Sequence, residues 1–322
     1  MTRTALVLAV AALAAVATTG GCGFGPGDAS PGRAELRVTR EFGTIPMVTA
    51  TLDDPTESDT VVRMLDSSAD LETSYGGNFV DSIDGYAGST AGGGDEDWFF
   101  FVNGYYSDIG SGETPVRPGD RIWWDYRYWS AAYRVPAVVG SWPEPFLHGY
   151  EGDRPATVVQ CLTDREPCDA VMASLEDEGI DARLERPAAP EPSPDELRVL
   201  VGPWDVVRGD PAARRIESGP GESGVYASFG RCAGATTLTV DDDHGRPVER
   251  FTDAGLIAAV RREPDQPTWV VTGTDATAAA GAAAALDGAV LRDRYAVAFS
   301  GGEPVPLPSP EAAPAGGPEA CR

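Results

Sequence analysis

The N-terminal leader decides in which compartment this chain folds, and therefore which covalent links its fold can contain. Met1–Arg3 is short and basic, and Leu6–Val16 is an apolar run rich in Ala, Leu and Val. This run is too short to cross a bilayer comfortably, but it is typical of the apolar part of a signal peptide. The sequence therefore predicts an exported protein from which residues 1–21 are removed.

Small residues lead into the first cysteine, because Thr18–Gly21 directly precedes Cys22. This order resembles the lipobox that bacterial lipoprotein signal peptidase reads. The resemblance implies lipidation of Cys22 and attachment to the outer face of the cytoplasmic membrane. The alternative is a cleaved signal followed by secretion. Residues 23–33 are rich in Gly, Pro, Ser and Asp and are expected to form a flexible tether.

The cysteine count supports the lipoprotein interpretation. Five cysteines cannot all pair as disulfides, so one cysteine of an exported chain needs another role. If Cys22 carries the lipid, four thiols remain for two disulfides in an oxidising compartment. Cys161 with Cys168 is the natural local pair, and Cys232 with Cys321 would then hold the C-terminal tail. Sequence alone permits three connectivities.

The chain is strongly acidic, with a formal charge of −25 and no lysine. This charge argues against nucleic acid as a partner and against electrostatic attachment to anionic lipid headgroups. The cytoplasmic membrane is therefore a partner through lipid alone. One acyl chain binds only marginally, so the several chains of a bacterial lipoprotein matter here.

Hydrophobic periodicity predicts an α+β protein with an N-terminal β-grasp-like domain followed by one or two small α/β units. Alternation predicts a strand at Ala34–Thr39. A second strand at Thr49–Leu52, a helix, and strands at Phe79–Ile83, Trp98–Val102 and Arg121–Trp129 complete the order of a β-grasp. The expected boundaries are a signal peptide at 1–21, a lipidated tether at 22–33, the β-grasp domain at 34–134, an α/β unit with a Pro-rich linker at 135–194, a C-terminal α/β unit at 195–300, and a Pro/Gly-rich tail at 301–322.

Three segments of the first domain carry a family resemblance. They are Tyr75–Gly85, Asp97–Gly104 and Gly110–Trp124, in which turn residues and aromatic residues alternate in a fixed order. Together they resemble the DUF4430 family, a β-grasp domain related to the C-terminal domain of transcobalamin. The resemblance implies a cell-surface binding module. It also implies a corrinoid or vitamin-like ligand, because the animal relatives hold cobalamin.

The rest of the chain is predicted to form α/β structure. A β-α-β order over Thr157–Leu184, followed by Leu197–Trp204, is weakly similar to SPOR domains, and that resemblance implies peptidoglycan binding. Asp253–Arg262 is predicted to be helical, with Leu256, Ile257 and Val260 on one side. An Ala-rich helix capped by Thr274 or Asp275 is expected before a closing strand.

Signals for catalysis and metal binding are poor. No nucleophile elbow, P-loop or dinucleotide fingerprint is present, so no catalytic residue and no cofactor are predicted. The cysteine spacing fits no zinc pattern, and only His148 and His244 are available as imidazole ligands. Asp241–Gly245 offers oxygen ligands for calcium but lacks the loop spacing and the distal Glu, so a turn between strands is the favoured interpretation.

Aromatic residues are the more informative signal, because five of the seven tryptophans lie between Trp98 and Trp142. On Arg121–Trp129, one face carries Ile122 and Trp124 and the other carries Trp123 and Asp125. Only one face can pack on the β-grasp helix. The other is either covered by the next block through Trp142–Phe146 or exposed as a binding platform. The candidate contact residues are Trp98, Phe100, Tyr105, Tyr106, Trp123, Trp124, Tyr126, Tyr128 and Trp129.

Two functional hypotheses follow. The first is a non-enzymatic surface lipoprotein whose β-grasp domain binds a small molecule, corrinoid or vitamin-like, or a membrane transport partner such as a vitamin-uptake transporter. The second is a cell-envelope structural protein that binds peptidoglycan or another surface protein. A hydrolase with an unrecognised site is a third and weaker hypothesis.

Overall fold

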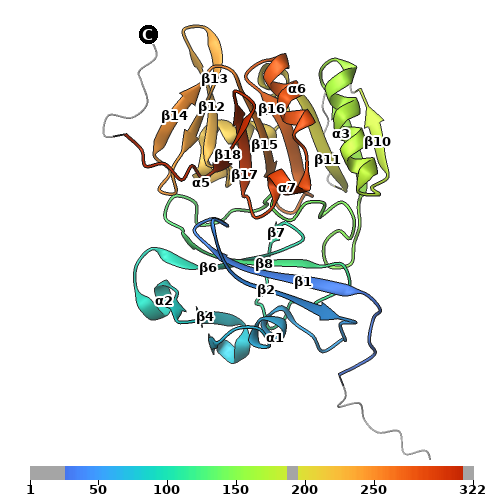
Figure 1. Ribbon diagram of the computed structural model, residues 1–322, viewed down its shortest axis with the longest axis vertical. Helices are drawn as coiled ribbons and strands as arrows, with labels where there is room; N and C mark the ends of the chain where they lie inside the picture. Colours follow the sequence, from blue (N-terminus) through green and yellow to red (C-terminus); the bar gives the residue numbers. More distant parts are fainter. Residues whose placement is uncertain (1–25, 187–194, 315–322) are drawn as a thin grey trace, which may run out of the picture.

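The computed structural model describes residues 26–186 and 195–314. Two domains joined by residues 134–155 stack one above the other, the N-terminal domain below and the C-terminal domain above (Figure 1). Cys22 and the predicted linker at 187–194 lie outside the described residues. Within the part of the chain that is described, no helix is long and apolar enough to cross a membrane.

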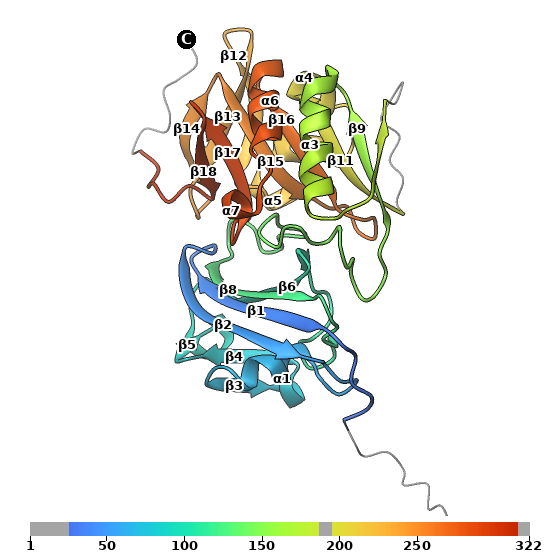
Figure 2. The same ribbon diagram turned by 45° about the vertical axis from the view of Figure 1, so that its right-hand side comes forward.

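The N-terminal domain has the strand order of a β-grasp, as predicted. Its main sheet runs β2-β1-β8-β6-β7, and β1 and β8 pair in parallel at its centre while the other pairs are antiparallel. A small sheet and three short helices cover one face (Figure 2). The elements are β1 (Arg33–Arg40), β2 (Ile45–Asp53), α1 (Val61–Asp66), β3 (Leu71–Ser74), η1 (Tyr75–Gly77), β4 (Phe79–Ile83), β5 (Tyr86–Ala87), α2 (Ser89–Gly92), β6 (Glu96–Val102), β7 (Tyr105–Tyr106) and β8 (Arg121–Tyr128).

Alternation along the strands gives this sheet two buried faces. Leu36 and Val38 of β1, with Ile122 and Trp124 of β8, pack on Leu65 of α1 and form the core of the N-terminal domain. The intervening residues of the same strands point to the other side, because successive side chains of a strand lie on opposite faces. That second face meets the C-terminal domain.

The C-terminal domain is built on one seven-stranded sheet in the order β10-β9-β11-β16-β15-β17-β18. The first four strands are parallel, and β15, β17 and β18 add antiparallel pairs. The strands are β9 (Ala156–Cys161), β10 (Ala182–Glu185), β11 (Glu196–Pro203), β15 (Ala254–Val260), β16 (Thr268–Gly273), β17 (Ala296–Ser300) and β18 (Glu303–Leu307). Strands from both sides of the predicted linker share this sheet, so the α/β part is one unit rather than two, and β18 extends it into the predicted tail.

Both faces of the seven-stranded sheet are covered. The helices α3 and α6 lie side by side on one face (Figures 1 and 2), and short helices with a three-stranded sheet pack on the other. The elements are α3 (Arg165–Asp177), α4 (Trp204–Val207), η2 (Ala213–Ser218), α5 (Pro220–Ser223), β12 (Ala227–Cys232), β13 (Ala235–Asp241), β14 (Pro247–Phe251), α6 (Ala276–Ala284) and α7 (Gly288–Leu291). Asp275 caps α6 by accepting from the Ala278 amide, as predicted.

The helix predicted over Asp253–Arg262 is wrong, because Ala254–Val260 is strand β15. All seven residues of β15 are buried, since the strand lies inside the sheet between β16 and β17. A strand covered on both faces is apolar at nearly every position, so it lacks the alternation that identifies a half-buried strand.

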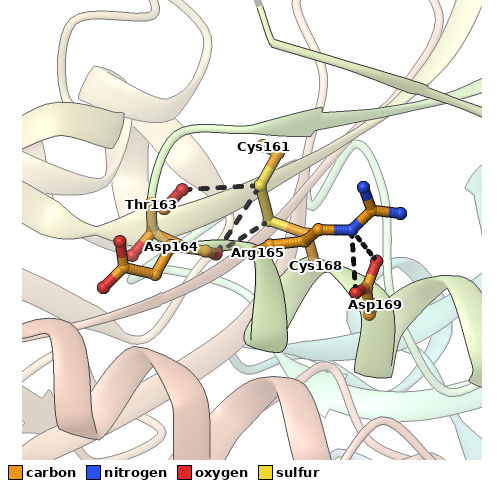
Figure 3. The surroundings of a disulfide bond; sticks show 6 residues. All are labelled: Cys161, Thr163, Asp164, Arg165, Cys168 and Asp169. Atoms are coloured by element: carbon orange, nitrogen blue, oxygen red, sulfur yellow. Dashed lines mark hydrogen bonds and ion pairs between the residues drawn. A yellow bond between two sulfur atoms is a disulfide. The ribbon is translucent and has the colours of Figure 1, made fainter.

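The local disulfide was predicted correctly. Cys161, the last residue of β9, bonds to Cys168 in the first turns of α3, with 5.7 Å between the two Cα atoms (Figure 3). Cys232 is also disulfide-bonded. Its predicted partner, Cys321, lies outside the described residues.

Candidate functional site

The nine predicted contact aromatics separate into three locations. Trp98, Phe100, Trp124 and Tyr126 pack in or against the core of the N-terminal domain. Trp123 lies on the opposite face, beneath the C-terminal domain. Three of the remaining four, Tyr105, Tyr106 and Tyr128, lie at the contact between the domains. Trp129 packs edge-on against Tyr133 at 5.8 Å.

These four residues have aromatic or polar neighbours. Tyr105 stacks on Tyr150 at 4.6 Å and donates a hydrogen bond of 2.6 Å to Gln266 of the C-terminal domain. Burial raises the pKa of the Tyr105 hydroxyl, so it stays a neutral donor. Tyr128 stacks on His244 at 4.2 Å. These contacts give Tyr105 and Tyr128 a packing role between the domains, and the four residues do not form one exposed platform.

A cavity of about 190 Å³ is nevertheless present in the N-terminal domain. It opens between β4, β6 and the segment after β7. Half of the residues in its walls are aromatic, and the polar residues among them are Asn78, Ser107 and Asp108. Trp124 stacks on Phe100 at 4.7 Å beside it, and the Trp124 Nε1 atom is buried with no hydrogen-bond partner in the described residues. The lining includes Phe79, Trp98, Phe99, Phe100, Tyr106, Ile109 and Trp124. We call this the aromatic cavity; it brings together four of the predicted contact residues.

The contact between the domains is centred on one buried carboxylate. Asp125 of β8 accepts hydrogen bonds from the Thr39 hydroxyl at 2.6 Å, the Gly43 amide at 3.1 Å and the Tyr295 hydroxyl at 3.0 Å. Burial nevertheless raises the pKa of Asp125 to about 6, because removal from water disfavours the charged form more than these bonds favour it. Asp125 thus joins three segments that are distant in the sequence.

A buried arginine lies two residues further along the same face. Arg127 donates to the carbonyl oxygens of Ala132 at 2.8 Å and Tyr133 at 3.1 Å, and its guanidinium lies 3.9 Å from the centre of the Phe99 ring. Phe42, at the turn between β1 and β2, packs edge-on against Tyr226 and Tyr295 at 5.0 Å. The sequence predicted none of these contacts. It predicted only that Arg127 and Trp123 share one face of their strand.

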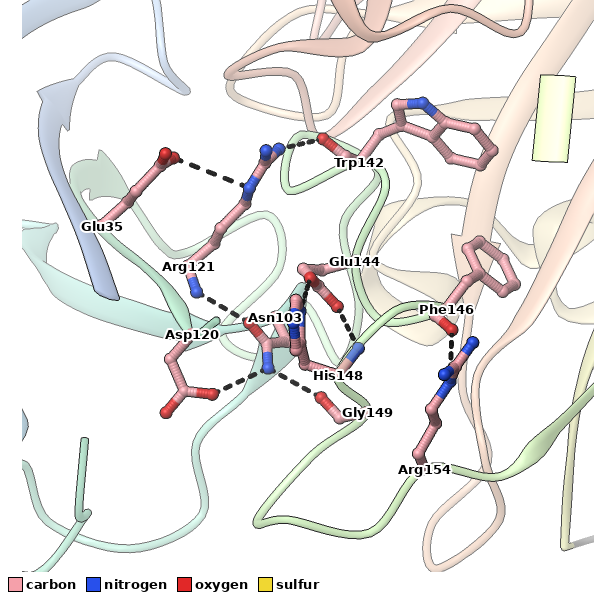
Figure 4. Close-up of polar contacts among 10 residues, drawn as sticks. All are labelled: Glu35, Asn103, Asp120, Arg121, Trp142, Glu144, Phe146, His148, Gly149 and Arg154. Carbon is pink, nitrogen blue, oxygen red and sulfur yellow. Dashed lines mark hydrogen bonds and ion pairs between the residues drawn. The ribbon is translucent and has the colours of Figure 1, made fainter. Parts of the chain in front are cut away.

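The segment between the domains is held by hydrogen bonds to the N-terminal sheet (Figure 4). Asn103 donates to Asp120 at 2.9 Å and to the Gly149 carbonyl oxygen at 2.8 Å. Burial raises the pKa of Asp120. The buried Glu144 bonds to both the backbone amide and the ring Nδ1 of His148, at 2.9 and 2.5 Å. His148 is thereby engaged in positioning the connecting segment.

The acidic motif at Asp241–Gly245 is a turn between β13 and β14, the interpretation that the sequence favoured. Asp242 accepts from the backbone amides of His244 at 3.0 Å and Arg246 at 2.8 Å, and it also pairs with the Arg246 side chain. These bonds lower the pKa of Asp242. Asp242, Asp243 and His244 do lie close enough to share an ion. The bonds to Arg246 already neutralise the buried carboxylate of this group.

Comparison with known proteins gives one family match. Residues 58–127 match the model described as "Domain of unknown function (DUF4430)". The solved structures include a protein from Ruminococcus gnavus described as a "putative metal binding protein". It is 16% identical, with a TM-score of 0.24, over 30% of this chain and 97% of its own. No curated protein matches the sequence.

The family match extends from just before α1 to the end of β8, so it contains every residue of the aromatic cavity. It omits β1 and β2, although β1 pairs with β8 in the centre of the same sheet. As the three sequence motifs predicted, residues 58–127 of the N-terminal domain are a DUF4430 match.

Proposed function

We propose that the protein is a non-enzymatic binding protein of the cell surface, and that the aromatic cavity of its DUF4430-matching domain is the binding site. The observation that carries the proposal is the cavity itself, since an apolar pocket with few polar groups is the usual form of a small-molecule site. Trp124 lines the cavity, and its Nε1–H is a buried donor with no hydrogen-bond partner among the described residues.

The volume of the cavity limits what enters it. An apolar cavity of roughly 150 Å³ holds a molecule as large as benzene, so about 190 Å³ takes one ring or a short branched chain. A corrinoid or other vitamin-like ligand is much larger and would insert only one edge. The proposed partner is therefore a small apolar molecule or the apolar edge of a larger one, delivered to a membrane transport protein.

Titration calorimetry with cobinamide and cobalamin tests the corrinoid form of this proposal. Ile109 lines the cavity with 39% of its surface exposed, so Ile109→Asp places a carboxylate at the opening without disturbing the core. We expect this change to weaken binding at least about tenfold, because the ligand must then desolvate a charge. Val206→Asp, at an exposed apolar residue of α4 outside the cavity, is the matched control.

The outcome separates the two hypotheses raised by the sequence. Equal affinities for the Ile109→Asp and Val206→Asp proteins would remove the aromatic cavity as the site. Absence of heat with either corrinoid, together with retention of the protein on peptidoglycan, would replace the small-molecule function with a cell-envelope structural role.

A further inference from the structure

A second cavity, of about 180 Å³, lies between the two domains and shares no residue with the aromatic cavity. Its floor is the outer face of the N-terminal sheet. Strand register places Glu35 between Thr51 and Arg121, and Arg37 between Thr49 and Trp123, in two adjacent rows. Its remaining wall comes from Gly140–Trp142 of the connecting segment and from Arg292 and Asp293 after α7. We call it the interdomain cavity.

The charged groups of the interdomain cavity are unevenly engaged. The charge of Arg37 is paired within the protein: it contacts both carboxylate oxygens of Asp293 and donates to the Thr49 hydroxyl at 3.1 Å. Arg121 donates to the Trp142 carbonyl oxygen and lies 3.6 Å from Glu35 (Figure 4). An arginine carries five N–H donors, so Arg121 has donors to spare.

Arg292 differs from both. Its side chain is exposed at the cavity, and no hydrogen bond or ion pair joins its guanidinium to another residue of the described ranges 26–186 and 195–314. Three guanidinium groups and two carboxylates line the cavity, so one positive charge is left over. This surplus stands out in a chain whose formal charge is −25.

We propose that the interdomain cavity binds a small organic monocarboxylate, with its carboxylate on Arg292 and Arg121 and its apolar body beside the Trp123 ring. One surplus positive charge matches one negative charge. Arginine is suited to this role because its planar fork of donors matches the two oxygens of a carboxylate. The Trp123 ring and the aliphatic parts of the side chains on the strands supply an apolar surface, and the volume accepts a single ring.

Benzoate is the probe, because it combines one carboxylate with one ring, and benzamide is its neutral counterpart of the same shape. Trp123 and Trp142 line the cavity, so binding to the purified protein is followed by intrinsic fluorescence and by calorimetry. We expect benzoate to bind at least about tenfold more tightly than benzamide, acetate or inorganic phosphate. Charge-assisted hydrogen bonds favour the carboxylate over benzamide, and the ring favours benzoate over the two simple anions.

The variant Arg292→Gln removes the surplus charge at an exposed position and leaves the ion pairs between the domains in place. We expect it to weaken benzoate binding about tenfold and to leave benzamide binding unchanged. Arg262→Gln is the matched control, because Arg262 is also exposed and does not line the cavity. Equal binding of benzoate and benzamide, tighter binding of phosphate, or equal losses in the two variants would each overturn the proposal. Loss of corrinoid binding in the Ile109→Asp protein bears only on the aromatic cavity.

Discussion

Some single side chains of this protein form hydrogen bonds with segments that are far apart in the sequence, and Asp125 is the clearest example. Its carboxylate receives donors from β1, from the turn after β1 and from Tyr295, which lies 170 residues further along. The hydroxyl of Tyr295 has its own pKa raised, by burial first and by the charge of Asp125 second. Both groups therefore favour forms without charge.

The raised pKa of Asp125 predicts how stability changes with pH. A carboxyl that takes up its proton more readily when folded contributes stability below its unfolded pKa of 3.8, and this contribution is lost as pH rises to about 6. The free energy of unfolding of the native protein, relative to Asp125→Asn, should fall by on the order of 2–3 kcal/mol between pH 4 and 7. The free energy of unfolding is measured by urea denaturation at each pH. The exposed Asp66→Asn variant is the control. Parallel profiles for the native and Asp125→Asn proteins would contradict this account.

The sequence predicted which residues share a face but not what covers them. Trp123, Asp125 and Arg127 were assigned to one face of their strand from alternation, and they do lie together. Packing through Trp142–Phe146 was the expected cover. Trp142 and Phe146 instead pack on Trp269 in the C-terminal core, and Tyr295 covers Trp123 at 5.2 Å. Periodicity is local information, whereas the covering residue, Tyr295, lies just before β17, far away in the sequence.

The helix α6 lies close to the sheet at two glycines. Gly255 and Gly273 are paired directly across β15 and β16, and the Ala-rich helix lies on them. A Cβ atom at Gly273 would lie 2.3 Å from the Ala279 amide nitrogen, whereas one at Gly281, inside α6, would meet nothing within 4 Å. The same substitution should therefore have opposite effects at the two glycines.

We expect Gly273→Ala to lower the free energy of unfolding by about 1–3 kcal/mol, because the helix must move away from the sheet. Gly281→Ala should raise it by about 0.5–1 kcal/mol, because alanine loses less conformational freedom in a helix. Thermal and urea unfolding of the two variants measure the difference. An unchanged or raised free energy of unfolding for Gly273→Ala would show that the helix does not rest on this glycine pair.

The whole molecule, in our proposal, is held at the membrane by lipid on Cys22. The acidic, lysine-free surface offers no electrostatic alternative. Cys22→Ser should release the protein into the medium, and fractionation with immunodetection measures the shift. Asp66→Asn is the control, because it changes an exposed residue and leaves Cys22 in place. Retention of the Cys22→Ser protein in the membrane fraction would rule out the anchor.

The contacts that close the interface also fix the order in which the domains can finish folding. Arg37 is made 256 residues before its partner Asp293, a delay on the order of 10–50 s at ordinary rates of synthesis. From the moment they are made until Tyr295 follows, Phe101 and Trp123 lack the ring that covers them, however well their own strands have paired. A chain arrested before Tyr295 would thus expose an aromatic face of its N-terminal sheet. The N-terminal domain therefore stays prone to aggregation until the C-terminal residues that cover this face have been synthesised.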